Sequence, residues 1–434
     1  MDHFTPSWVA LRAPFQDCFR PEVFLTFRLM LTAWVVCLGR RTISRVWETT
    51  GHSDEQDHSK AFRLFNHAAW NWDEVCRLLL VRLLAAFVPG ARVWLVIDDT
   101  LCHKRGAKVA FGGIFLDAVL SSKKHKVFRF GVNWVTLGLV VQLPFRQDRF
   151  VCLNILWRVY RKKTAGLPHQ TKSQRARQML EVVADWLPQC ALYAVADSAY
   201  VGKRLLKGLA ENAHIIGPIH WKAALTRPLP EGHHGRQRIG VRLTSPKEAL
   251  DDQRWGWTDL RLRHPKGEKG LRVKVVGPCC WYASAGQRTL QVILVRDPEG
   301  KWRDETLLST DVGLSAQEVV AGYLRRWSVE VAYCESKQLL GFHDPMVWSE
   351  KGVERAHPLV WFVANLVVLW YATTGQDEPA AQRHRPWYLD KVGPTFADML
   401  ACCRLHLWQG WLDTDQEKRA EKWEWLLEYI ATAA

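Results

Sequence analysis

Two short apolar runs that end in aspartate constrain the fold of this chain more than any other feature. The first is Val93–Ile97, followed by Asp98 and Asp99, and the second is Leu192–Ala196, followed by Asp197. A continuous apolar run of this length is typical of a central strand that is buried on both faces. Open α/β sheets place their chemistry at the carboxyl ends of such strands. We therefore expect an α/β fold with carboxylates gathered at strand ends.

The adjacent pair cannot point both carboxylates to one place. Successive residues of a strand face opposite sides of the sheet, so one of Asp98 and Asp99 is expected to reach a shared site. A simpler interpretation remains open for each run. The first acids could cap a turn at a loop start, and Asp197 could be the N-cap of a helix that begins at about Val201.

A third acidic residue falls in the stretch Gly322–Gly341, which forms the larger part of a long predicted helix. A capping-box pattern at Ser315 and Glu318 marks its start, and Gly341 suits a left-handed stop, which predicts about 25 helical residues. Helical spacing places four polar residues on one face: Tyr323, Arg326, Glu330 and Lys337. An adjacent stripe should face a core: Val320, Leu324, Trp327 and Val331. A solvated ladder of ion pairs is the plain alternative for the polar face.

The spacing of the polar face resembles a known signature. Tyr323, Arg326, Glu330 and Lys337 match the Y-R-E-K pattern of a group of bacterial insertion-sequence transposases of the DDE class, which have an RNase H-like catalytic core. In that group the first catalytic aspartate stands just before a threonine. The resemblance therefore implies a catalytic triad of Asp99, Asp197 and Glu330, with Asp98 held in reserve.

The same resemblance implies a chemistry and its partners. The triad would hold two Mg²⁺ ions, for which Mn²⁺ can substitute, and these clamp the attacking and leaving oxygens of a phosphoryl displacement. Tyr323, Arg326 and Lys337 would contact the DNA strand beside the scissile bond. The implied activity is cut-and-paste transposition, with cleavage of DNA ends and strand transfer. The implied partners are double-stranded DNA (terminal inverted repeats and target) and a second copy of the chain, forming a homodimer on the DNA.

The charge of the chain agrees with a nucleic-acid partner. The formal net charge is +15 and the pI is about 9.4. Residues 101–190 hold 16 Lys or Arg against four Asp or Glu, too lopsided for an ordinary solvated face. We expect this segment to follow a phosphate backbone. The lysines predicted to bind DNA are Lys104, Lys123, Lys124 and Lys126.

The pattern of elements predicts five segments. Residues 1–90 read as a helical DNA-binding domain with a helix-turn-helix-like stretch around Gly51, although an ordinary helical platform would read the same. Residues 91–220 and 306–375 form the two parts of the RNase H-like core. Residues 221–305 are rich in Gly, Pro and strand-like runs and resemble a β-rich insertion domain. Residues 376–434 form a helical region whose last helix is a candidate for dimerisation.

The eleven cysteines show no zinc-binding spacing, which favours a reducing compartment. The N-terminus lacks the pattern of a signal peptide. The apolar stretches at 23–39 and 358–373 read as buried helices rather than membrane spans, since each contains a polar residue. We expect a bacterial cytoplasmic protein, associated with the nucleoid when it is bound to DNA, with no membrane partner.

Three rival functions can be weighed from the sequence. A tyrosine recombinase would need an Arg-Lys-His-Arg set with a tyrosine near the C-terminus, and this pattern is not found. A domesticated DNA-binding protein without catalysis would keep the basic surface but would usually have lost an acidic residue. A Mg²⁺-dependent nuclease of RNase H-like fold that does not transpose differs only in lacking strand transfer.

Overall fold

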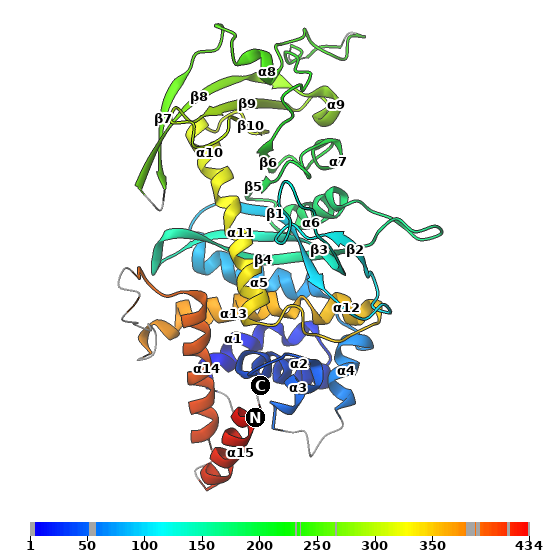
Figure 1. Cartoon of the computed structure of the whole chain (residues 1–434), viewed down its shortest axis with the longest axis vertical. Helices are drawn as coiled ribbons and strands as arrows, with labels where there is room; N and C mark the ends of the chain where they lie inside the picture. The colour runs from blue at the N-terminus through cyan, green and yellow to red at the C-terminus, as the bar shows by residue number, and fades with distance from the viewer. Residues whose placement is uncertain are drawn as a thin grey trace.

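The structure is a computed structural model, and it describes residues 5–51, 58–230, 232–234, 236–264, 267–378, 387, 391–414 and 417–432. A helical base lies at one end of the molecule, and a long sheet extends from it (Figure 1). The N-terminal helices are α1 (Pro6–Arg12), η1 (Ala13–Cys18), α2 (Pro21–Val36), α3 (Ile43–Glu48), α4 (Ser59–Asn66) and α5 (Trp72–Phe87). Part of the turn after Gly51, on which the helix-turn-helix interpretation depends, lies outside the described residues.

One mixed sheet holds every named strand. The strands are β1 (Arg92–His103), β2 (Gly113–Leu116), β3 (Phe128–Leu143), β4 (Arg146–Tyr160), β5 (Ala191–Ala196), β6 (Ala213–Pro218), β7 (Thr258–His264), β8 (Gly267–Cys280), β9 (Thr289–Arg296) and β10 (Glu305–Ser309). Their order is β2-β3-β1-β5-β6-β10-β9-β8-β7, and β4 also pairs with β3. The strands β1, β5 and β6 run parallel, whereas β3 is antiparallel to β1 and β4.

Both apolar runs form the central strands that the sequence predicts. Leu95, Val96 and Ile97 are fully buried, as are Ala194 and Val195 on β5. Apolar side chains on both faces are the reason that these strands lie inside the sheet rather than at an edge. One detail differs from expectation. The strand β1 continues to His103, so Asp98 and Asp99 lie within the strand and not at its end.

The β-rich segment after residue 220 continues the same sheet. The strand β10 pairs with β6 on one side and with β9 on the other, so β9, β8 and β7 extend the sheet without a break. Short helices lie between strands along the chain: α7 (Lys203–Leu206) precedes β6, α8 (Pro246–Ala249) precedes β7, and α9 (Tyr282–Ala285) precedes β9. The segment is β-rich as predicted, but its strands are joined to the central ones by backbone pairing.

The long helix predicted after Ser315 is broken in the middle. It consists of α10 (Ala316–Leu324), a 3₁₀ turn η2 (Arg325–Trp327) and α11 (Ser328–Leu339). The capping box at Ser315 is present, and Gly341 has a φ of 68°, as its stop position requires. In Figure 1 these helices run along one face of the sheet, from β10 down to β4.

The break corrects the predicted apolar stripe. Val320 is buried, but Leu324, Trp327 and Val331 are exposed by 39%, 66% and 41%. The tighter 3₁₀ turn rotates α11 relative to a continuous α-helix, so a helical wheel drawn through both halves fails. Val329, Tyr333 and Ser336 face the protein instead.

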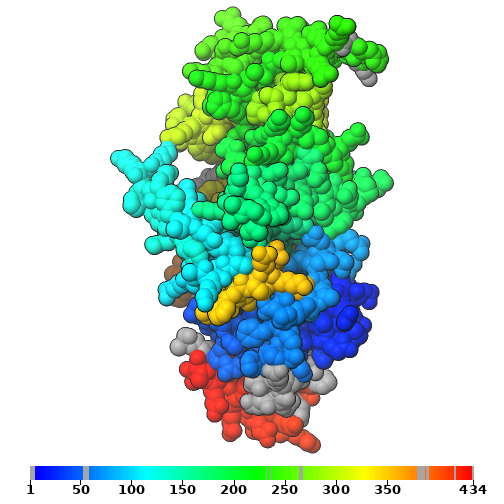
Figure 2. Space-filling model, turned by 90° about the vertical axis from the view of Figure 1, so that its right-hand side faces the viewer, coloured from blue at the N-terminus to red at the C-terminus, as the bar shows by residue number. Residues whose placement is uncertain are grey.

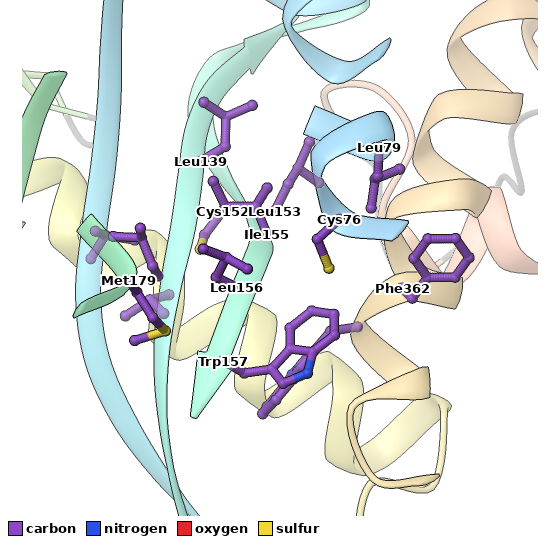
Figure 3. Packing of buried hydrophobic residues seen from close by; sticks show 14 of the residues in the cluster. Cys76, Leu79, Leu139, Cys152, Leu153, Ile155, Leu156, Trp157, Met179 and Phe362 are labelled. Carbon is purple, nitrogen blue, oxygen red and sulfur yellow. The ribbon is translucent and has the colours of Figure 1, made fainter. Parts of the chain in front are cut away.

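The remaining helices close the fold around β4. They are α6 (Lys172–Trp186), α12 (Glu350–Ala356), α13 (Leu359–Thr373), η3 (Gly375–Asp377), α14 (Phe396–Asp413) and α15 (Arg419–Ala431). Figure 3 shows Leu153 and Trp157 of β4 packed beside Cys76 of α5 and Phe362 of α13. The stretch Glu350–Thr373 is the only described helix long and apolar enough to cross a membrane, and 83% of its apolar window is buried inside the protein.

Candidate active site

The two adjacent aspartates of β1 serve opposite faces of the sheet. Asp98 lies on the face that α10, η2 and α11 cover, because its Oδ2 accepts a hydrogen bond from Arg326 Nη1 of η2 at 3.1 Å. Asp99 lies on the face that α6 covers, because its Oδ2 accepts from Lys172 Nζ at 2.6 Å. The expectation that a single acid of the pair reaches one site agrees with this geometry. The acid that faces Arg326 is Asp98.

The Asp98 carboxylate is largely buried, and its few hydrogen bonds only partly offset the free-energy cost of removing it from water. Its side chain is 13% exposed, and its Oδ1 accepts a hydrogen bond from the backbone N–H of Asp99 at 2.8 Å. Burial raises the pKa of Asp98 to about 7, and the negative charges of Asp99 and Glu330 add to this effect. The Asp99 N–H and the Arg326 guanidinium act in the opposite direction. Such a group gains from a further cation beside it.

Asp197 is brought next to Asp98 by the parallel pairing of β1 and β5. Ile97 pairs with Ala196, so the next residue of each strand continues the same register and side. Asp197 directly follows β5, and its Oδ1 accepts hydrogen bonds from Ala199 N and Ser198 Oγ. Asp197 thus holds the turn that follows its strand, but it is not the N-cap of the next helix, because α7 begins at Lys203 with Gly202 at that position.

Glu330 enters the same neighbourhood from the first turn of α11. A hydrogen bond of 2.6 Å between Tyr333 Oη and Thr136 Oγ1 of β3 seats this helix on the sheet. Thr136 is the β3 partner of Asp98, so the contact lies beside that carboxylate. Burial lowers the pKa of Arg326, but Asp98, Tyr323, Asp197 and Glu330 outweigh it and raise that pKa overall. The charges of the three acids thus act on one guanidinium, which contacts Asp98 directly.

The donor set fits a hard divalent cation, although it is not drawn together into a metal cage. Carboxylate oxygens are the ligands that Mg²⁺ and Mn²⁺ prefer. Within the residues that the structure describes, no three His, Cys, Asp or Glu side chains converge closely enough to hold a metal ion. Arg326 supplies the positive charge beside Asp98.

Asp99 is the centre of a separate hydrogen-bond network. Its Oδ2 also accepts from Asn133 Nδ2 at 3.0 Å, and its Oδ1 accepts from Tyr200 Oη at 2.7 Å. Together with Lys172 these donors satisfy the carboxylate on the face opposite Glu330. Tyr200 belongs to the turn that Asp197 begins, so Asp99 ties that turn to β1.

The other residues of the predicted signature lie along the same helices. Tyr323 is half-buried, and the Arg326 guanidinium lies 5.8 Å from the centre of its ring. Burial raises the pKa of Tyr323. Lys337 is half-buried near the end of α11, where burial lowers its pKa while Asp117, Cys102 and Glu330 oppose the change.

The predicted DNA-binding lysines fall into two groups. Lys104 is engaged within the fold, because its Nζ donates to the carbonyl oxygens of His343 at 2.6 Å and Pro345 at 2.8 Å. Its ammonium group is therefore engaged within the fold, and its role as a DNA contact stays a prediction. Lys123, Lys124 and Lys126 are exposed between β2 and β3.

Some residues around the candidate site were not predicted from sequence. Thr136 and Tyr333 seat α11, and Lys172 and Tyr200 hold Asp99. Tyr333 lies three residues after Glu330, one turn along the same helix, and this spacing is a signal that could have identified it. The contacts of Thr136, Lys172 and Tyr200 depend on strand register and turn geometry that the sequence does not display.

Comparison with protein families agrees with this arrangement. A family model described as DDE superfamily endonuclease matches residues 14–267, which is more than half of the chain. The chain belongs to the DDE superfamily of endonucleases. Membership implies a metal-dependent nuclease. The matched region contains Asp98, Asp99 and Asp197 and ends before α11, so the place of Glu330 rests on its geometry. A search of curated proteins finds no match.

Proposed function

We propose that this DDE endonuclease is an insertion-sequence transposase of the Y-R-E-K group, which cuts the ends of its element and joins them to target DNA. The observation that carries the proposal is the ion pair of Arg326 with Asp98, on a strand whose parallel neighbour leads into Asp197 and beside the helix that carries Glu330. The three acids come from β1, the end of β5 and the start of α11. In this proposal the five strands β4, β3, β1, β5 and β6 form the RNase H-like core.

The proposed triad takes Asp98 in place of Asp99. The reason is geometric, since Asp98 faces Arg326 and α11, whereas three donors engage the Asp99 carboxylate on the opposite face. Burial raises the pKa of Asp98 even though Arg326 lies beside it. Perturbed groups of this kind are common at catalytic sites.

The three carboxylates would hold divalent cations. Such ions, when bound, activate a water or a 3′-hydroxyl and stabilise the leaving oxygen. The chain's own residues would do the positioning. Arg326 would bind a phosphate beside the scissile bond once Asp98 coordinates a metal ion. Its planar guanidinium group can donate two parallel hydrogen bonds to phosphate oxygens. Tyr323 would pack against the same strand, and Lys337 would meet a phosphate further along α11.

The remaining partners belong to the same proposal. The exposed Lys123, Lys124 and Lys126 would contact the DNA backbone. A homodimer on DNA follows from the resemblance, and a helical N-terminal DNA-binding domain follows from the position and composition of residues 1–90. Exposed apolar side chains of α15 (Trp423, Leu427 and Ile430) support a dimer contact there.

The test uses a plasmid that carries the gene of this chain with its flanking sequence. Purified protein with Mg²⁺ or Mn²⁺ should cut at the two flanks and insert the freed segment into a second plasmid, and EDTA should stop both steps. Cutting without insertion would favour a nuclease that does not transpose. Binding to the flanks without cutting would favour an inactive DNA-binding protein.

A further inference from the structure

An apolar tip projects from the basic segment between β2 and β3. Val119 is 75% exposed and Leu120 is 50% exposed, and Phe128 at the start of β3 is 59% exposed. Exposed apolar residues that occur singly need no explanation, but these are grouped on one protrusion. Figure 2 shows the cyan part of the chain, which includes this segment, standing out from the side of the molecule.

The tip is held in a fixed shape. Asp117 Oδ1 accepts hydrogen bonds from the backbone N–H groups of Val119 and Leu120, each at 3.1 Å. Its Oδ2 lies 2.6 Å from His103 Nε2, at the end of β1. The backbone N–H of Asp117 donates to the carbonyl of Val127 at 2.9 Å, which closes the base of the loop. The apolar pair is therefore presented without a large ordering cost on binding.

The surroundings of the tip indicate the kind of partner. Lys123, Lys124 and Lys126 are exposed in the same loop, and Asp117, the acid of this loop, is buried and engaged. A surface of this kind suits a polyanion that also offers apolar faces to stack on. Nucleic acid meets both requirements, since its backbone is negative and its bases are flat and apolar.

The position of the tip connects it to the candidate active site. His103, which lies 2.6 Å from the Asp117 carboxylate, donates its backbone N–H to Nδ1 of His343 at 3.1 Å. This places the loop near the end of α11, where Lys337 lies. Lys337 follows Glu330 by seven residues, or about 10 Å along a helix. A DNA duplex that lies along α11 would reach the loop about three base pairs from the candidate catalytic acids.

We propose that Val119 and Leu120 form a wedge that enters DNA between adjacent bases while Lys123, Lys124 and Lys126 hold the backbone. Apolar side chains that unstack a base step and bend the duplex are a known device of DNA-binding proteins. The proposal rests on the proposed function for the presence of DNA at α11. It adds that this enzyme distorts the duplex beside the site of cleavage.

The test compares binding to a fluorescent duplex that is fully paired and to one with two adjacent mismatches, in EDTA so that cutting does not interfere. A mismatch has already lost its stacking, so a wedge enters it at lower cost. Wild type should prefer the mismatched duplex by about tenfold. The double variant Val119→Ser, Leu120→Ser should lose this preference and keep its affinity for paired DNA within about threefold.

Two matched variants separate the outcomes. Val241→Ser removes an exposed apolar side chain from the β-rich segment, outside the loop and the proposed DNA-binding domain, and should retain the preference. The triple variant Lys123→Ala, Lys124→Ala, Lys126→Ala should bind both duplexes more weakly, with a shallower salt dependence.

An equal affinity of wild type for both duplexes, or a preference that survives in the double variant, would overturn the wedge. Neither result bears on whether the protein cuts DNA. Conversely, a preference for mismatches without metal-dependent cutting would leave the wedge in place and overturn the transposase.

Discussion

The Arg326 guanidinium donates a hydrogen bond to Asp98 across 3.1 Å, from a 3₁₀ turn to the middle of a central strand. This contact joins the part of the chain that matches the DDE endonuclease family to the helix that lies beyond the match. The charges of Asp98, Asp197 and Glu330 all act on Arg326 and raise its pKa.

Replacing Arg326 should shift the pH profile of DNA cleavage. The positive charge of Arg326 lowers the pKa of Asp98, so Arg326→Ala should raise that pKa and move the acidic limb of the profile to higher pH. Loss of a positioned donor to the phosphate should also reduce the cleavage rate by about 100-fold. Arg326→Lys keeps the charge and should leave the pH profile near that of wild type. An unshifted profile in Arg326→Ala would contradict the pairing.

Asp98 should make the metal-free protein less stable as the pH rises from about 4 to about 7. The folded-state pKa of Asp98 is raised to about 7, so the folded protein keeps a proton that the unfolded chain has released. The stabilising contribution of this proton is fully present below the pKa of Asp98 in the unfolded chain. It is lost as the pH rises through the pKa of Asp98 in the folded protein. Asp98→Asn should therefore raise the free energy of unfolding at pH 8 by roughly 1–3 kcal/mol.

Urea unfolding in EDTA at pH 5 and pH 8 measures this effect. Burial also raises the pKa of Glu335 to about 7. Glu335→Gln should therefore independently reduce the pH dependence of the free energy of unfolding over the same pH range. The double variant Asp98→Asn, Glu335→Gln should show the flattest profile. If the pH dependence of the free energy of unfolding is unchanged in both single variants, this would contradict the raised pKa values of Asp98 and Glu335.

Asp99 should matter for stability. Its removal leaves Tyr200, Lys172 and Asn133 without their acceptor, so Asp99→Ala should lower the free energy of unfolding by about 2–3 kcal/mol. Tyr200→Phe removes one of these donors and should cost about 1 kcal/mol. Chemical unfolding gives both values. A loss below about 0.5 kcal/mol for Asp99→Ala would show that the network is not formed.

Gly322 should tolerate no side chain. A Cβ at this position would lie 2.5 Å from Cζ3 of Trp94, where α10 crosses β1. Alanine normally stabilises a helix relative to glycine, but here it would push the helix off the sheet. Gly322→Ala should therefore lower the melting temperature, equivalent to about 1–3 kcal/mol, and reduce cleavage. Ala321→Gly, at the neighbouring position, is the control for helix propensity alone.

Much of the fold could be predicted because the relevant signals are local. The apolar runs before Asp98 and Asp197 form buried strands, and the capping box at Ser315 begins a helix. These features depend on the polarity and hydrogen bonding of neighbours in sequence. The continuation of the sheet through β9, β8 and β7 depends on pairing between distant strands, which composition does not reveal.

The sequence indicates which acids belong to the candidate site, but it does not indicate which face of the sheet each side chain points to. The sequence shows that one of Asp98 and Asp99 faces the long helix, but the choice depends on which side of β1 that helix packs. The same limit applies to Lys104, whose ammonium group is engaged by carbonyls more than 230 residues away in sequence. Likewise, no clear feature of the sequence indicates the 3₁₀ turn at Arg325–Trp327. This turn is the reason that the predicted apolar stripe does not face the core.

Cleavage of the gene-flanking DNA in Mg²⁺ by Asp98→Asn and Asp99→Asn, beside wild type, tests the central assignment most directly. We expect Asp98→Asn to abolish cutting while it still binds the DNA, as Asp197→Asn and Glu330→Gln should also do. Asp99→Asn should retain measurable cutting once its lower stability is allowed for by working at low temperature. The reverse result, with activity in Asp98→Asn and none in a folded Asp99→Asn, would contradict the assignment and return the first catalytic position to Asp99.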